Sequence, residues 1–196
     1  MNNPTLLVID VQKGFDDPFW GNRNNPDAES NITTLISAWR SKQLPVIHIQ
    51  HCSLDPDIPL HPDRPGYAFK EEALPIAGEK QFTKTVNSAF IGTNLERYLK
   101  DQNINDLVIV GLTTDHCVST TTRMAGNLGF NVILASDATA TFDRTGHDGV
   151  EYSADDIHRI HLASLNNEFC TVRTTEWILE NISYQGTSPD GVERRQ

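Results

Sequence analysis

The chain has 196 residues, of which 38% are hydrophobic and 21% are charged, and its formal net charge is −10. A chain of this length can bury the core of one domain. Its acidic balance, without a basic cluster, argues against nucleic acid and an anionic membrane as partners. No apolar run approaches the ~20 residues of a membrane-spanning helix. We therefore expect a globular domain outside the membrane.

The cysteines are few and odd in number: Cys52, Cys117 and Cys170. Such a set is typical of a reducing compartment rather than of a disulfide framework. The N-terminal residues carry no basic segment ahead of the first apolar run, so no signal peptide is indicated. The sequence thus predicts a cytoplasmic protein.

In chain order, the apolar pattern predicts strands that alternate with helices. Short apolar or β-branched runs predict six strands, at residues 5–10, 45–50, 81–84, 107–112, 131–135 and 169–172. Apolar residues at helical spacing predict helices at residues 32–39 and 118–128. A capping box at residues 93–96 and a polar start at residues 153–156 predict the beginnings of two more.

This alternation is typical of the α/β class. Near-continuous apolar strands joined by helices predict a Rossmann-like, doubly wound sheet of six parallel strands with helices on both faces. We assign residues 1–182 to this single domain and the polar residues 183–196 to a flexible tail. In such folds, ligands bind beyond the carboxyl ends of the strands.

Residues 111–118, Gly-Leu-Thr-Thr-Asp-His-Cys-Val, join the fourth predicted strand to a helix. This places Cys117 in a first helical turn, where unpaired backbone N–H groups and the helix dipole favour an anion. A thiol in that position tends toward the nucleophilic thiolate. The alternative interpretation is that Cys117 is a small, buried core residue.

Other reactive side chains stand at the same predicted edge of the sheet. Asp10 ends the first strand, Lys84 ends the third, and Asp137 follows the fifth. Each also has a structural interpretation, since Asp10 and Asp137 suit turns and Lys84 suits the surface. The coincidence of an acid, a cation and a thiol at strand ends nevertheless predicts a catalytic group.

At these positions the chain resembles the isochorismatase-like cysteine hydrolases, which include nicotinamidases, N-carbamoylsarcosine amidases and ureidoacrylate amidases. The resemblance spans about residues 5–180. It rests on four segments in the family's order: Leu-Val-Ile-Asp-Val-Gln at 7–12, Lys-Thr-Val-Asn-Ser-Ala-Phe at 84–90, the segment at 111–118, and Ser-Asp-Ala-Thr at 136–139. The four segments together are specific for the family.

The resemblance implies a catalytic triad. Cys117 matches the nucleophile that forms a thioester, Asp10 matches the general base, and Lys84 matches the cation that favours the charged forms of both. The backbone N–H groups of Thr113 and Cys117 match the oxyanion hole. The resemblance also implies a cis peptide between Leu112 and Thr113, where no proline is present.

No metal ion and no other cofactor are expected. Nicotinamidases of this family bind a divalent ion through an Asp-x-His pair after the second strand and another histidine. The matching segment here, His-Ile-Gln-His-Cys at residues 48–52, lacks the carboxylate. His48 and His51 have opposite parity on a strand, so both cannot face one ion without a bend. The loss of this motif argues against nicotinamide as the substrate.

Three functions remain open. A cysteine at position 117 favours hydrolysis of a C–N bond, in a small amide or ureido compound, through a thioester. Isochorismatase-type hydrolysis of a vinyl ether is the alternative, and it needs no thiol. The third is a silent family member that acts as a binding protein. A dinucleotide-binding protein is excluded, because residues 10–14, Asp-Val-Gln-Lys-Gly, lack the glycine motif.

Candidate substrate contacts lie near the triad in the sequence: Gln12, Phe15, Trp20, Asn87, Phe90 and His116. Aromatic residues at strand ends are as often part of the core as of a pocket. Residues 142–149 are polar and contain glycine, which favours a surface loop over a lid or a subunit contact. By resemblance we expect a homodimer or homotetramer.

Overall fold

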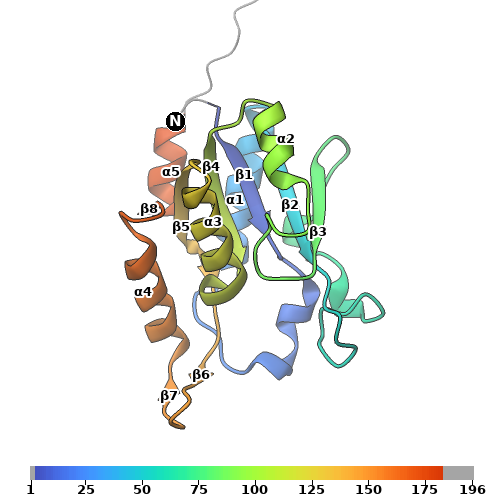
Figure 1. Cartoon of the computed structure of the whole chain (residues 1–196), viewed down its shortest axis with the longest axis vertical. Coiled ribbons are helices and arrows are strands. Elements are labelled where there is room, and N and C mark those ends of the chain that lie inside the picture. The colour runs from blue at the N-terminus through green and yellow to red at the C-terminus, as the bar shows by residue number, and fades with distance from the viewer. Residues whose placement is uncertain (1–2, 183–196) are drawn as a thin grey trace, which may run out of the picture.

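Six parallel strands form the central sheet, in the order β3-β2-β1-β4-β5-β8 (Figure 1). The computed structural model describes residues 3–182, so the predicted tail at residues 183–196 lies outside the described part of the chain. The strands are β1 Thr5–Ile9, β2 Val46–His51, β3 Lys80–Lys84, β4 Asp106–Leu112, β5 Asn131–Ala140 and β8 Thr171–Arg173. The predicted α/β class and the six-stranded parallel sheet are confirmed.

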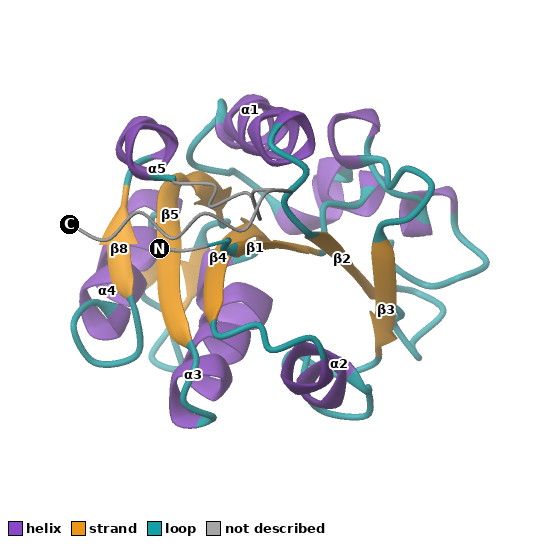
Figure 2. Ribbon diagram, turned by 90° about the horizontal axis from the view of Figure 1, so that it is seen from above, coloured by secondary structure: helices purple, strands orange, loops and turns teal. Residues whose placement is uncertain are grey.

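Helices cover both faces of the sheet (Figure 2). On one face lie α1 Ala28–Ser41 and α5 Thr175–Asn181, and on the other lie α2 Leu95–Asp101, α3 Ser119–Asn127 and α4 Ala154–Leu165. Short 3-10 helices cover Lys13–Asp16, Pro18–Trp20, Pro65–Tyr67 and Glu71–Ala73. Among the described residues, no helix is long and apolar enough to cross a membrane.

The alternation of side chains along the strands creates a core on each face. Leu6 and Val8 of β1 pack with α1 and α5, whereas Leu7 and Ile9 pack with α2 and α3. Both sets are fully buried, because a central parallel strand has no solvent-facing side. Each buried aliphatic side chain stabilises the fold by about 1.5–3 kcal/mol.

The structure corrects several predicted boundaries. Strand β5 continues to Ala140 past a register shift in its pairing with β4, which apolar patterning alone does not reveal. The predicted capping box is wrong: Asn94 precedes α2, and the Thr93 hydroxyl donates to the carbonyl of Ala89 and accepts the N–H of Leu95 rather than that of Glu96. In contrast, Ser153 caps α4 as predicted, through the N–H of Asp156.

Two elements were absent from the sequence-based prediction. The short helix α5 has too few apolar positions to show a clear period. The segment at residues 142–149 forms part of an antiparallel hairpin of β6 Arg144–Thr145 and β7 Glu151–Tyr152, which projects from the domain (Figure 1). Hairpins this short leave almost no alternation pattern in the sequence.

Candidate active site

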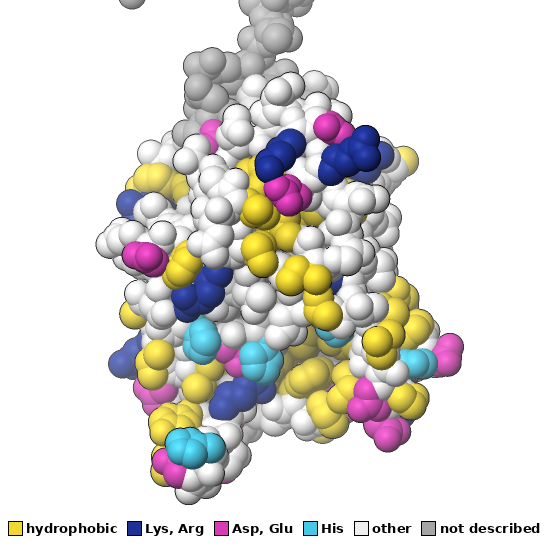
Figure 3. Space-filling view, in the orientation of Figure 1, with side chains coloured by type: hydrophobic (Ala, Val, Ile, Leu, Met, Phe, Trp, Pro, Cys, Tyr) yellow, Lys and Arg dark blue, Asp and Glu magenta, His cyan; other side chains and the backbone are white. Residues whose placement is uncertain are grey.

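The strand order brings the predicted triad to one edge of the sheet. The chain builds β2 and β3 on one side of β1 and then returns to place β4 on the other side. The carboxyl ends of β1 and β4 therefore flank a switch point, where such folds bind ligands. Asp10 directly follows β1, and Cys117 lies in the turn after β4. Apolar side chains line a hollow toward the lower end of the molecule (Figure 3), the end to which the strands of Figure 1 point.

Lys84, the last residue of β3, is the centre of a buried polar cluster. Its Nζ donates hydrogen bonds to Oδ2 of Asp10 at 2.6 Å and to Sγ of Cys117 at 3.2 Å, and it lies 3.0 Å from Nδ1 of His51. The side chains of Lys84 and Asp10 have no exposed surface. An ammonium group carries three N–H donors, so these three acceptors use all of them.

The electrostatics of this cluster oppose the thiolate that the helix end favours. Burial raises the pKa of the Cys117 thiol, the Asp10 carboxylate raises it further, and the Lys84 ammonium opposes them only in part. Burial alone would lower the pKa of Lys84, but Asp10 and Cys117 outweigh burial and leave that pKa raised. The cluster therefore combines a thiol whose pKa is raised with an ammonium whose pKa is also raised.

Asp10 is positioned to take the thiol proton of Cys117. Its Oδ2 is paired with Lys84, whereas its buried Oδ1 has no hydrogen-bond partner among the described residues. A carboxylate oxygen of Asp10 and Sγ of Cys117 lie within 4.8 Å of each other. Asp10 also has a φ of 52°, a left-handed conformation that is uncommon outside glycine and often occurs at functional sites.

Cys117 sits in an irregular turn rather than at the start of a regular helix. The Leu112–Thr113 peptide is cis, as the resemblance predicted. One π-helical turn, Thr114–Val118, then carries Cys117 into α3. The carbonyl of Thr113 accepts the N–H groups of His116 and Val118, which fixes the turn around the thiol.

Asp115 fixes this turn through hydrogen bonds to a separate segment of the chain, a role that the sequence analysis missed. It accepts hydrogen bonds from Nε of Arg144 at 2.8 Å and from the hydroxyl of Thr141. Burial alone would raise the pKa of Asp115, but Arg144 and Thr141 lower it to about 2. The charged pair ties the β6–β7 hairpin to the turn that holds the nucleophile. The only signal in the sequence was an acid within the segment at 111–118.

The potential metal donors fit an ammonium rather than a metal ion. Among the described residues, Asp10, His51 and Cys117 form the one group of donor atoms close enough to hold an ion. Nζ of Lys84 contacts all three donor atoms, so its positive charge would repel a metal ion at the same place. His48 faces the other way, with Nε2 2.8 Å from Glu79, as its strand parity predicted.

The six predicted substrate contacts fall into three pairs. Asn87 and His116 are exposed, and Oδ1 of Asn87 lies 3.6 Å from Sγ of Cys117. Phe15 and Trp20 pack together with Phe142 in a small aromatic cluster, with the Phe15 and Trp20 ring centroids 5.1 Å apart. These aromatic rings pack with Leu112, the last residue of β4, in one buried cluster.

The other two predicted contacts are engaged within the protein. Phe90 stacks on Phe130 at a centroid distance of 5.9 Å. Gln12 is fully buried, and its amide bonds to the backbone of His51 and Tyr67. Asp137, which the sequence analysis also considered, accepts bonds from Thr175 at the start of α5 and is structural.

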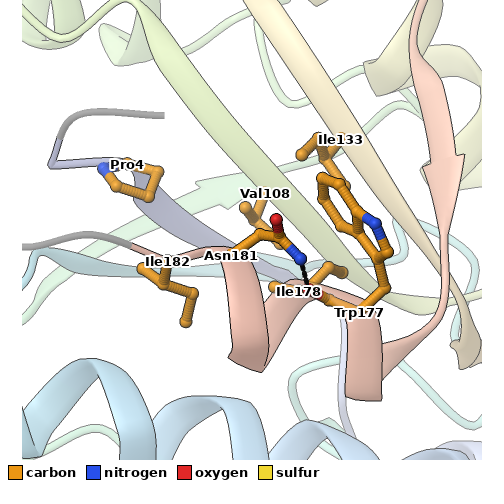
Figure 4. Close-up of a pocket in the computed structure, with 7 residues that line it drawn as sticks. All are labelled: Pro4, Val108, Ile133, Trp177, Ile178, Asn181 and Ile182. Atoms are coloured by element: carbon orange, nitrogen blue, oxygen red, sulfur yellow. Dashed lines mark hydrogen bonds between the residues drawn. The ribbon is translucent and has the colours of Figure 1, made fainter.

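A separate apolar cavity of about 110 Å³ lies at the opposite, amino-terminal edge of the sheet (Figure 4). It is lined by residues that precede β1, begin β4 and β5, or belong to or directly follow α5: Pro4, Val108, Ile133, Trp177, Ile178, Asn181 and Ile182. Its single internal hydrogen bond joins Asn181 to the carbonyl of Trp177 at 2.8 Å. This cavity therefore holds no part of the triad.

Comparison with known proteins identifies the family. Residues 4–176 match the model of the isochorismatase domain. The chain is 52% identical to the isochorismatase family protein YrdC of Bacillus subtilis, covering 90% of this chain and 94% of that one. It is 28% identical to nicotinamidase 3 of Arabidopsis thaliana, covering 73% and 76%. An isochorismatase-family crystal structure from Chromobacterium violaceum matches with a TM-score of 0.88 and 47% identity, covering 90% and 92%. The chain is therefore a member of the isochorismatase family of hydrolases.

Proposed function

We propose that the protein hydrolyses a C–N bond of a small amide or ureido compound, with Cys117 as the nucleophile. The observation that carries the proposal is the buried contact of one ammonium with both a carboxylate and a thiol, at 2.6 and 3.2 Å. One carboxylate oxygen of Asp10 has no partner among the described residues, and the Asp10 carboxylate lies within 4.8 Å of the thiol. This set supplies a nucleophile, a base and a fixed positive charge.

The first half of the reaction forms a thioester. Oδ1 of Asp10 takes the thiol proton as Sγ of Cys117 bonds to the carbonyl carbon of the substrate. The carbonyl oxygen becomes an oxyanion, which we assign to the backbone N–H groups of Thr113 and Cys117. Asp10 then gives its proton to the substrate nitrogen, the C–N bond breaks, and the amine or ammonia leaves.

The second half releases the acid. A water molecule attacks the thioester carbon and gives a proton to Asp10. The C–S bond breaks, the proton returns to Cys117, and the carboxylic or carbamic acid departs. Lys84 keeps its positive charge throughout the reaction. It stabilises Sγ of Cys117 when that atom is negatively charged, and it orients Asp10.

The thiol favours this chemistry over vinyl-ether hydrolysis. Protonation of a vinyl ether needs an acid and a water molecule but no nucleophile on the protein. A relative named nicotinamidase supports amide hydrolysis within the family. The donor arrangement around Lys84 differs from a metal site, so we propose that the substrate is held without a metal ion.

The test is release of ammonia or amine across a panel of small amides and ureido compounds without added metal. The panel includes nicotinamide, N-carbamoyl amino acids, maleamate and ureidoacrylate-like acids. We compare the wild type with Cys117→Ala and with Cys170→Ala, a matched control because Cys170 is also buried but its thiol bonds to the carbonyl of Leu165 rather than to Lys84. Turnover by the wild type and Cys170→Ala, and none by Cys117→Ala, is the expected result. Turnover that survives Cys117→Ala excludes the thioester.

A further inference from the structure

His51 lies beside Lys84 because two parallel strands pair in a fixed register. The Cα atoms of His51 in β2 and Lys84 in β3 are register partners, so their side chains leave the same face of the sheet. This brings Nδ1 of the imidazole to 3.0 Å from Nζ of the ammonium. His48, three residues earlier, faces the opposite side and contacts Glu79.

The chemistry of the pair fixes the proton positions on His51. An ammonium only donates, so Nδ1 of His51 must accept and the ring proton sits on Nε2. Burial lowers the pKa of His51, the Lys84 charge lowers it further, and Asp10 opposes both only in part. The imidazole is thus neutral, as an acceptor for Lys84 requires.

Gln12 holds the backbone of His51 in place. Its Oε1 accepts the His51 N–H at 2.8 Å, and its Nε2 donates to the carbonyl of His51 at 3.0 Å. The same Nε2 donates to the carbonyl of Tyr67 at 2.9 Å. One buried amide therefore satisfies both backbone groups of His51 and fixes the imidazole at the end of β2.

We propose that His51 is a positioning residue of the triad, whose Nδ1 accepts the third N–H of Lys84. The other two N–H groups then point at Oδ2 of Asp10 and Sγ of Cys117. This inference rests on the proposed thiol chemistry and extends it to a fourth side chain. Without an acceptor at that point, the ammonium turns or leaves one buried N–H unpaired, and its bond to the thiol weakens.

Two substitutions of similar polarity test the position of the acceptor. His51→Asn places an amide oxygen near the site of Nδ1, whereas His51→Gln places it one bond farther out, near the site of Nε2. We measure the rate of Cys117 alkylation by iodoacetamide at pH 8 with peptide mass spectrometry. We also measure kcat and KM on a substrate from the panel.

The expected result separates the two variants. His51→Gln lowers the alkylation rate and kcat about tenfold, because a weaker ammonium contact lowers the thiolate fraction. KM changes less than kcat, and His51→Asn restores most of both rates. Equal behaviour of the two variants, or wild-type rates in both, overturns the proposal.

The alkylation readout separates this inference from the proposed function. If no panel compound is turned over, the alkylation rates still test the His51–Lys84 contact. If turnover occurs and His51→Gln hydrolyses normally, the positioning role is wrong while the hydrolase proposal stands. His48→Asn is the control on the same strand: it removes the contact with Glu79 and lowers the melting temperature, yet leaves Cys117 alkylation unchanged.

Discussion

Lys84 and Asp10 form an ion pair with Nζ and Oδ2 2.6 Å apart and no exposed surface on either side chain. The attraction between two buried charges offsets the cost of removing them from water only while both charges are present. Lys84→Met leaves the Asp10 carboxylate buried without a counter-charge, so we expect a loss of about 3–5 kcal/mol in the free energy of unfolding. Urea denaturation at pH 7 measures it.

The double variant Asp10→Asn with Lys84→Met is the matched control for this prediction. It removes both charges, so part of the lost stability returns while hydrolysis stays absent. A Lys84→Met protein with the urea midpoint of the wild type would show that the pair contributes nothing to stability.

Asp10→Asn separates thiol ionisation from catalysis. The Asp10 carboxylate raises the pKa of Cys117, so its removal lowers that pKa and increases the thiolate fraction at neutral pH. We expect faster alkylation of Cys117 by iodoacetamide. Hydrolysis falls by about 10²–10⁴-fold, because the base that transfers the proton is gone.

The two rates, measured on the same preparation, thus move in opposite directions. Asp63→Asn, at an exposed carboxylate between β2 and β3, is the control and changes neither. If Asp10→Asn lowered both the alkylation rate and the hydrolysis rate, the role of Asp10 would be to stabilise the thiolate of Cys117 rather than to accept the thiol proton.

The convergence of Asp10, Lys84 and Cys117 was predictable because carboxyl ends of parallel strands meet at one edge. Asp10 and Cys117 follow apolar strands and Lys84 ends a short strand, so their convergence required only the order of strands. The part played by His51 was not predictable, because it depends on the register between β2 and β3. A one-residue slip would turn its side chain to the other face.

The remaining errors have similar causes. The expectation of a thiolate considered the helix end alone, whereas burial and the Asp10 carboxylate from another strand raise the pKa of Cys117 and Lys84 opposes them. The pair of Asp115 and Arg144 joins residues from two separate turns, and no local pattern links them. Long-range polar contacts were therefore the part of the site that could not be predicted from this sequence.

Two buried carboxylates predict the response of the fold to acid. Burial alone would raise the pKa of Glu29, but Arg23 and Lys70 lower it to about 2, and the pKa of Asp115 is also about 2. Both values lie below the ~4 of an unfolded chain. The stability they provide is therefore complete above about pH 4 and is lost as the pH falls toward 2.

Glu29 accounts for about 3 kcal/mol of that change, and Asp115 accounts for about 2 kcal/mol. Asp115→Asn should lower stability at pH 7 by this amount and flatten the decline between pH 4 and pH 2, as followed by urea midpoints. The exposed Asp63→Asn keeps the wild-type decline. A steep decline that persists in Asp115→Asn would place the acid sensitivity in other groups.

Gly111 links both strands of the site through its backbone. Its φ is +122°, and a Cβ atom there would lie 2.0 Å from the carbonyl oxygen of Ile9, the residue before Asp10. Gly111→Ala must therefore move β1 against β4, and with them the base and the turn that carries the nucleophile. We expect a loss of more than about 3 kcal/mol in stability and of hydrolysis together.

Gly129→Ala isolates the part of this effect that comes from backbone conformation. Gly129 also has a positive φ, of +88°, but a Cβ atom there meets nothing within 4 Å. We expect Gly129→Ala to cost only about 1–2 kcal/mol and to leave kcat unchanged. Equal unfolding free energies for the two variants would mean that β1 and β4 have room to separate. A stable but inactive Gly111→Ala would instead show that their close approach serves the alignment of Asp10 with Cys117 alone.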